Sequence, residues 1–230
     1  ACENTVLQYV HDWKSTIERL GRWVEFDGSY KTMDVSYMES VWWAFKEIWK
    51  KGLIYEGRRV LMYCPRCETP VSKAEVAMDN SYKEVNDESV IVSFPITDKK
   101  FIKDKCFGRN TSFVAWTTTP WSIPTTMGLA IGLDFDYVIV KVGDNQIICA
   151  KKRLEYAINH LSPEKFEVVK ELKGKEIINV PYKHPFHEYF SHPEVANNSR
   201  VYKTHATDYV SIEEGTGIVT INGAFGEIDY

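Results

Sequence analysis

A run of three threonines at residues 117–119 is the part of this chain whose residue types most directly suggest chemistry. It follows an apolar run at residues 113–116 that is typical of a short buried strand, and Pro120 and Pro124 come next. Because proline cannot continue a paired strand, the chain leaves the sheet here. Three hydroxyl groups at a strand end can bind a polar ligand through hydrogen bonds. A threonine-rich strand followed by a turn, without any ligand, fits the same pattern.

A Cys-x-x-Cys knuckle at Cys64 and Cys67 has the spacing of half a tetrahedral thiolate zinc site. The other cysteines, Cys2, Cys106 and Cys149, form no second knuckle. We therefore expect a reduced turn with two free thiols, and metal binding only if further ligands lie outside this chain.

Three histidines, His184, His187 and His192, could suggest a second metal site. Their spacing fits neither one face of a strand nor one face of a helix. The sequence therefore predicts a solvated loop here.

The composition excludes several classes of protein. The chain has 230 residues, is 44% hydrophobic and carries a net charge of −4. This charge gives no global basic field, so any contact with RNA must come from local patches. An odd number of cysteines without a signal-peptide pattern suggests a reducing, cytoplasmic compartment, and no apolar run has membrane-spanning length.

Helical periodicity dominates the first third of the chain. Apolar residues recur on one face over residues 5–20 and again over residues 35–51. Gly21 is expected to follow the end of the first helix, while Asp34 caps the start of the second and Gly52 ends it.

Short strands replace the helical pattern after residue 86. A helix at residues 152–161 should bury Leu154, Ala157, Ile158 and Leu161, and Gly143 begins a hairpin turn. We predict an α+β fold: a mainly helical connecting segment at residues 1–85, then a β-barrel-like domain at residues 86–230. The expected strands span residues 90–94, 112–116, 137–142, 146–150, 166–169, 176–180, 200–203, 209–212 and 217–221.

Three separate motifs resemble isoleucyl-tRNA synthetases of the eukaryotic, cytoplasmic type. Thr-Thr-Thr-Pro-Trp-Ser-Ile-Pro at residues 117–124 is similar to the threonine-rich peptide of their editing domain. Gly-Thr-Gly-Ile-Val at residues 215–219, followed by Phe-Gly-Glu-Ile-Asp-Tyr at residues 225–230, is similar to a second motif of that domain. Trp-Lys-Ser-Thr at residues 13–16 resembles a segment upstream of it. Valyl and leucyl relatives carry Thr-Thr-Arg-Pro where this chain has Thr-Thr-Thr-Pro, which favours the isoleucyl branch.

The resemblance implies a proofreading function. A hydrophobic pocket separates isoleucine from valine by only about 1–3 kcal/mol, a general limit for which the isoleucyl enzymes are the standard example. A second site must therefore hydrolyse valine from Val-tRNA(Ile). An aminoacyl ester is already activated, so a positioned water and hydroxyl or N–H donors suffice without a metal or other cofactor.

The resemblance also implies a larger enzyme around this chain. The full-length ligase would use ATP and Mg²⁺ to join isoleucine to tRNA(Ile), and a structural Zn²⁺ would arise only there. This chain lacks the His-Ile-Gly-His-like and Lys-Met-Ser-Lys-Ser-like signatures, so we expect a monomeric fragment that cannot aminoacylate alone. Its expected partners are the acceptor end of tRNA(Ile), valine or isoleucine, and the rest of the synthetase, with no membrane.

Site residues carry over from the resemblance one by one. Asp229 would anchor the α-ammonium group of the substrate, while Thr117, Thr118 and Thr119 would line the catalytic pocket. Trp121 is expected to pack beneath the loop rather than contact substrate. The implied substrate-binding residues are Trp116, Ser122, Thr126, Thr220, Phe225 and Gly226.

Several departures from the family pattern fall within these motifs. Thr220 replaces a histidine of the pocket wall, Thr126 replaces an asparagine, and Asn222-Gly223 replaces Ala-Pro, which we expect to loosen a turn. Ser122 replaces a common threonine. Two interpretations follow: an editing site of altered shape or rate, or a non-catalytic module that positions tRNA or braces the synthetase. The retained threonines and Asp229 favour hydrolysis.

Overall fold

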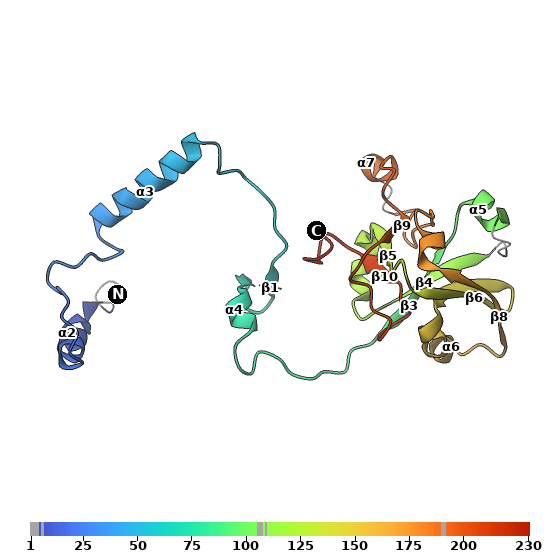
Figure 1. The fold of residues 1–230 in the computed structure, drawn as a ribbon, viewed down its shortest axis with the longest axis horizontal. Coiled ribbons are helices and arrows are strands. Elements are labelled where there is room, and N and C mark those ends of the chain that lie inside the picture. The colour runs from blue at the N-terminus through green and yellow to red at the C-terminus, as the bar shows by residue number, and fades with distance from the viewer. Residues whose placement is uncertain (1–4, 6, 105–107, 109, 190–191) are drawn as a thin grey trace. The chain divides into compact units, whose positions relative to one another are not determined.

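The computed structural model describes residues 5, 7–104, 108, 110–189 and 192–230. Cys2 and Cys106, two of the cysteines considered above, therefore lie outside the described residues, as does residue 6 of the first expected helix. Contacts divide the chain into two compact units, Ala1–Arg58 and Arg59–Tyr230 (Figure 1). The predicted boundary near residue 86 stays a prediction.

The first unit contains two described helices, α2 (Val10–Arg19) and α3 (Val35–Lys50), and neither has a buried residue. Both end as predicted at a glycine with positive φ, Gly21 (+76°) and Gly52 (+66°). Asp34 occupies the N-cap position of α3, but its carboxylate accepts the Lys31 N–H at 2.9 Å instead of capping the helix. The first helix is shorter than predicted, because a turn at residues 8–9 precedes α2.

The second unit begins with a small antiparallel pair, β1 (Met62–Cys64) and β2 (Thr69–Val71). The short helix α4 (Lys73–Val76) follows, and its N-cap Ser72 and Glu75 form a reciprocal capping box. The Cys-x-x-Cys knuckle therefore sits on a hairpin.

Two sheets form the rest of the second unit. The larger has the order β3-β4-β7-β6-β8, in which β4 and β7 run parallel and the other neighbours are antiparallel. The smaller has the order β10-β5-β9, with β5 parallel to β9 and antiparallel to β10. The strands are β3 (Val90–Pro95), β4 (Thr111–Thr117), β5 (Gly128–Ile131), β6 (Asp136–Val142), β7 (Asn145–Ala150), β8 (Phe166–Lys173), β9 (Lys203–Ala206) and β10 (Val219–Ile221).

The central strands of the larger sheet, β4, β7 and β6, are buried on both faces. Alternate residues of β4 show this: Phe113 joins a core cluster with Leu129 of β5, whereas Val114 joins a cluster with Ala157 of helix α6 (Leu154–Leu161). This arrangement explains why β4 reads as a continuous apolar run instead of an alternating one. The predicted strand end at the threonines is confirmed, because β4 stops at Thr117.

Several expected elements differ from the structure. Residues 176–180 form no strand, because the 3₁₀ turn η3 (Gly174–Ile177) and the positive φ of Asn179 (+59°) interrupt the extended backbone. Residues 209–212 also form no strand. The strand expected at 200–203 is displaced to β9 because Tyr202 has a positive φ of +56°. Strand β5 was not predicted, since four residues after a proline-rich turn give little periodicity.

The predicted helix at residues 152–161 is a 3₁₀ turn, η2 (Lys151–Arg153), followed by α6. Ala157 and Ile158 are buried as expected, but Leu161 is 38% exposed because it lies at the end of the helix, next to the left-handed Ser162. The remaining short helices are α5 (Lys99–Asp104), α7 (Pro193–Ala196) and the 3₁₀ turn η1 (Pro120–Thr125).

The α+β class is therefore correct. Among the described residues neither sheet closes on itself, so the barrel-like part of the prediction is not confirmed. The described helices include none with the length and apolar character needed to cross a membrane.

Candidate functional site

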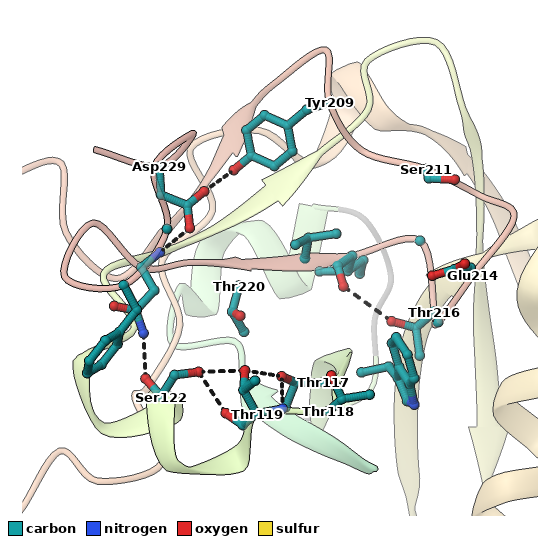
Figure 2. A pocket seen from close by; sticks show the side chains of 18 of the residues that line it. Thr117, Thr118, Thr119, Ser122, Tyr209, Ser211, Glu214, Thr216, Thr220 and Asp229 are labelled. Atoms are coloured by element: carbon teal, nitrogen blue, oxygen red, sulfur yellow. Dashed lines mark hydrogen bonds between the residues drawn. The ribbon is translucent and has the colours of Figure 1, made fainter. Parts of the chain in front are cut away.

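A cavity of about 490 Å³ lies where β4 and η1 meet the C-terminal residues 209–229. Figure 2 shows the threonines and Ser122 along one side, Asp229 and Tyr209 on the other, and Thr220 between them. The two motifs that resemble the family are thus brought to one cavity although about a hundred residues separate them. The predicted site residues that line it are Trp116, Thr117, Thr118, Thr119, Ser122, Thr220, Phe225, Gly226 and Asp229.

The threonine side of the cavity is a chain of hydroxyl groups. The oxygens of Thr117 and Thr119 lie 3.1 Å apart, and those of Thr119 and Ser122 also lie 3.1 Å apart. The Ser122 hydroxyl donates to the Thr119 carbonyl oxygen at 2.7 Å, so the chain ends on a main-chain acceptor. Only two residues separate the end of β4 from Pro120, which starts η1, and this tight turn brings Ser122 back onto Thr119.

Thr118 differs from its two neighbours. Its side chain is exposed to the cavity and makes no hydrogen bond to any other residue that the structure describes. Of the three threonines, Thr118 therefore carries the hydroxyl group that is most available to a ligand or a water molecule.

Asp229 is held by donors on both carboxylate oxygens. The Tyr209 hydroxyl donates to Oδ1 at 2.9 Å, and the Asn222 main-chain N–H donates to Oδ2 at 2.8 Å. Burial, followed by the neighbouring Asp229 carboxylate, raises the pKa of Tyr209 far above its ordinary value, which keeps the phenol protonated as the donor. The carboxylate is thus fixed at the cavity wall, with lone pairs left for a cationic ligand.

The back of the cavity is a turn at Gly215 and Gly217, with φ of +59° and +72°. Tyr137, fully buried in β6, donates its hydroxyl proton to the Gly217 carbonyl oxygen at 3.0 Å and accepts the Gly132 N–H at 3.1 Å. Arg153 Nε donates to the Gly215 carbonyl oxygen at 2.9 Å. The turn is therefore fastened to the rigid sheet and to η2.

His184 supports η1 from the core, contrary to the expected solvated loop. It is only 1% exposed; its Nδ1 accepts the Phe186 N–H at 3.0 Å, which leaves Nε2–H to donate to the Ile123 carbonyl oxygen at 3.0 Å. Burial lowers the pKa of His184. His187 and His192 are exposed, and the described residues contain no group of three side chains that could hold a metal. Spacing alone missed His184 because tertiary packing, not a local pattern, buries it.

Two other expectations for this region are wrong. Trp121 does not pack beneath the loop: it is 71% exposed and lines the cavity, because η1 turns its side chain outward. Thr126 does not line the cavity: it is 1% exposed, and its hydroxyl has no partner among the described residues.

Of the lining residues that sequence reasoning missed, two hold the Asp229 carboxylate. Tyr209 was placed in an expected strand, and Asn222 was expected to loosen a turn. The structure instead shows Asn222 buried, at 5% exposure, and hydrogen-bonded through both its main chain and its side chain. No local signal marks either residue, since Tyr209 bonds to Asp229 and the Asn222 side chain bonds to Ser122 and Thr125 only once the chain has folded.

The Cys64–Cys67 knuckle lies apart from this cavity. The Cys67 N–H points to Cys64 Sγ at 3.4 Å, and main-chain N–H groups of Cys67 and Arg66 lower the pKa of Cys64. A side-chain hydrogen bond with Cys64 raises the pKa of Cys67. Both thiols are free, as is Cys149, whose pKa burial raises to about 12.

Comparison with known proteins gives a family match over nearly the whole chain. The model of class I tRNA synthetases (I, L, M and V) matches residues 1–219. Isoleucine–tRNA ligase of Treponema pallidum (strain Nichols) is 39% identical over 100% of this chain and 22% of its own length. The ligase of Rickettsia typhi is 42% identical over 99% of this chain and 21% of its own length. The chain therefore spans about a fifth of the length of these relatives.

Solved structures resemble the chain more distantly. The crystal structure of GlLeuRS-CP1 has a TM-score of 0.47 and 15% identity over 58% of this chain and 54% of its own. The editing domain of the P. knowlesi cytosolic leucyl-tRNA synthetase has a TM-score of 0.47 and 12% identity over 59% of this chain and 56% of its own.

Proposed function

Since the chain belongs to the class I tRNA synthetases of the isoleucine, leucine, methionine and valine group, we propose that residues 86–230 form an editing domain that hydrolyses Val-tRNA(Ile). The observation that carries this proposal is the shared cavity: three consecutive threonines and the Asp229 carboxylate, brought from distant parts of the chain, face the same space.

The proposed chemistry needs only groups that the cavity contains. Asp229 anchors the α-ammonium group of the aminoacyl ester through charge-assisted hydrogen bonds. Thr118, with its free hydroxyl, contacts the attacking water or the developing oxyanion. The Thr117–Thr119–Ser122 hydroxyl chain fixes the backbone on either side of it. Water then attacks the ester carbonyl, and the bond to the ribose oxygen breaks to release valine and tRNA.

Deacylation of Val-tRNA(Ile) by the purified chain tests the proposal. We expect release of valine above the uncatalysed rate and slower release from Ile-tRNA(Ile). Asp229→Asn should lower the rate about 10- to 100-fold, because a hydrogen bond to a charged group is worth about 1.5–3 kcal/mol. Thr118→Ala should lower it about 2- to 10-fold, the value of a neutral hydrogen bond.

Asp144→Asn is the matched control for the loss of charge, because Asp144 lies in the exposed turn between β6 and β7, away from the cavity. It should keep the wild-type rate. Unchanged activity of Asp229→Asn would overturn the ammonium assignment.

The second candidate is a non-catalytic module that holds the acceptor end of tRNA or braces the synthetase. It is favoured by Thr220, which gives the cavity wall a hydroxyl where the resemblance implies an imidazole. Wild-type protein that binds tRNA(Ile) but releases no valine would support this candidate and overturn the proposed hydrolase function.

The larger enzyme is part of the same proposal. A full-length ligase would act in the cytoplasm, join isoleucine to tRNA(Ile) with ATP and Mg²⁺, and complete any zinc site at Cys64 and Cys67 with ligands from elsewhere. Trp116, Ser122, Thr220, Phe225 and Gly226 are proposed to contact the substrate; Thr126, which is buried off the cavity, would act only through its neighbours.

A further inference from the structure

We propose that Asn222 is a positioning residue that locks the threonine-bearing turn to the turn carrying Asp229, and so fixes the two sides of the cavity relative to each other. The consequence for catalysis rests on the proposed editing function, whereas the mechanical coupling does not.

Asn222 occupies the point where the two sides of the cavity diverge. Strand β10 ends at Ile221, whose carbonyl oxygen accepts the Met127 N–H at 2.9 Å, and this is the last main-chain bond between β10 and the segment that follows η1. Beyond it, the side-chain amide of Asn222 continues the connection. Nδ2 donates to the Ser122 carbonyl oxygen at 2.6 Å, and Oδ1 accepts the Thr125 hydroxyl at 2.9 Å.

The orientation of this amide follows from its partners. A carbonyl oxygen only accepts, so the NH₂ group must face Ser122 and the oxygen must face the Thr125 hydroxyl. The Thr125 hydroxyl also lies 3.0 Å from the Ser122 carbonyl oxygen, so the three groups form one closed cluster. An alanine at this position would remove the amide donor from the buried Ser122 carbonyl oxygen and the amide acceptor from the Thr125 hydroxyl.

The main chain of the same residue holds the opposite side of the cavity. Its N–H donates to Asp229 Oδ2 at 2.8 Å, and its carbonyl oxygen accepts the N–H groups of Phe225 and Gly226 at 3.1 and 2.9 Å. One buried residue therefore fixes the Asp229 carboxylate through its backbone and the Ser122 end of the hydroxyl chain through its side chain.

Two substitutions separate this role from a general structural one. Asn222→Ala removes both side-chain bonds at every pH. Asn222→Asp keeps the shape and an acceptor for Thr125, but its ionised carboxylate faces the Ser122 carbonyl oxygen with no proton to donate. The protonated carboxyl restores that donor. Burial and the nearby Asp229 carboxylate both favour the neutral form of the introduced group.

Deacylation of Val-tRNA(Ile) between pH 5.5 and 8 gives the first readout. Relative to wild type at each pH, Asn222→Ala should be slower by a constant factor of about 3- to 30-fold, the value of one or two hydrogen bonds. At pH 8 the Asn222→Asp variant should be at least as slow as Asn222→Ala. Its deacylation rate relative to wild type should rise about 5-fold or more by pH 5.5. The titratable groups on the cavity, Tyr209, Glu214 and Asp229, remain in all three proteins, so the ratio to wild type isolates the introduced carboxyl.

Hydrogen exchange gives a readout that needs no activity. In Asn222→Ala the amides of Ser122, Thr126 and Gly226 should exchange faster than in wild type, while those of the β6–β7 hairpin keep their rates. Thr125→Val removes one of the two side-chain bonds at an exposed residue, and should give a smaller change in the same amides even if Asn222→Ala does not fold.

The outcomes separate the two proposals. Wild-type protein without deacylase activity would overturn the proposed function, while exchange still tests the coupling. Unchanged exchange in Asn222→Ala, or in Thr125→Val if the first variant does not fold, would overturn the coupling. An active wild type with no recovery of Asn222→Asp at low pH would overturn the positioning role in catalysis.

Discussion

Hydrogen bonds fix the orientation of single side chains at the cavity and behind η1. Asp229 has one oxygen fixed by a phenol and the other by a main-chain N–H. His184 has one nitrogen accepting and the other donating, so its neutral form is the one that the fold requires. Both side chains are held by the protein before any ligand arrives, so they are preorganised.

His184 predicts a pH dependence of stability. Burial lowers its pKa below the ordinary value of about 6.5 in the unfolded chain. The unfolded chain therefore binds more protons as the pH falls through about 6.5, and the free energy of unfolding decreases. His184→Gln, which can keep a donor for Ile123 but does not titrate, should lose less stability between pH 7.5 and 5.5 than wild type, measured by urea unfolding.

His11→Gln is the control for this experiment, since His11 is exposed on α2 in the other unit. It should follow the wild-type pH dependence. Equal losses in wild type and His184→Gln would show that this histidine does not contribute.

At the scale of the elements, turns close to strand ends shape the cavity more than the strands themselves. The turn at Gly217 illustrates the constraint, because a Cβ there would collide with the Cβ of Ala150 on β7. Gly143, in the β6–β7 hairpin, has a similar φ of +60° but open space around it.

Paired glycine substitutions separate the two effects. Gly143→Ala should lower the free energy of unfolding by about 1–2 kcal/mol, the cost of a left-handed backbone for a residue with a Cβ. Gly217→Ala should cost about 1–3 kcal/mol more, because the collision adds overpacking to the same backbone strain. Urea unfolding measures both values. Equal costs would mean that the contact with Ala150 relaxes without penalty.

At the scale of the whole molecule, stability resides in the second unit. Both core clusters consist of residues from Ile91 to Ile218, whereas α2 and α3 bury no residue. The aromatic side chains of α3, such as Trp42 and Trp43, are exposed at 67% and 66%. The first unit therefore lacks a core of its own among the residues described.

Truncation tests this division. A chain of residues 59–230 should unfold at the midpoint temperature of the full chain, because no core residue is removed. A chain of residues 87–230 should do the same if the domain begins near residue 86, as proposed. Thermal unfolding followed by circular dichroism measures both. A drop of more than about 4 °C, which corresponds to about 1 kcal/mol or more for a chain of this size, would contradict the division.

The sequence by itself determined the features that depend on local pattern. The second helix and its glycine end, strands β3, β4, β6 and β7, and the Gly143 turn followed from periodicity and turn residues, because neighbouring residues alone decide them. The motifs also pointed to the family and to the residues of the site, since a motif is a local string.

Tertiary structure alone decided how those residues meet. Only folding places Asp229 across a cavity from Thr118, buries His184 behind η1, and turns Asn222 into a link between two turns. Tyr209 lies in no strand, and its hydroxyl forms a hydrogen bond with Asp229. The physical reason is common to all of them: each contact joins residues that the sequence separates or leaves without periodic signal, so its free energy exists only once the sheets have packed.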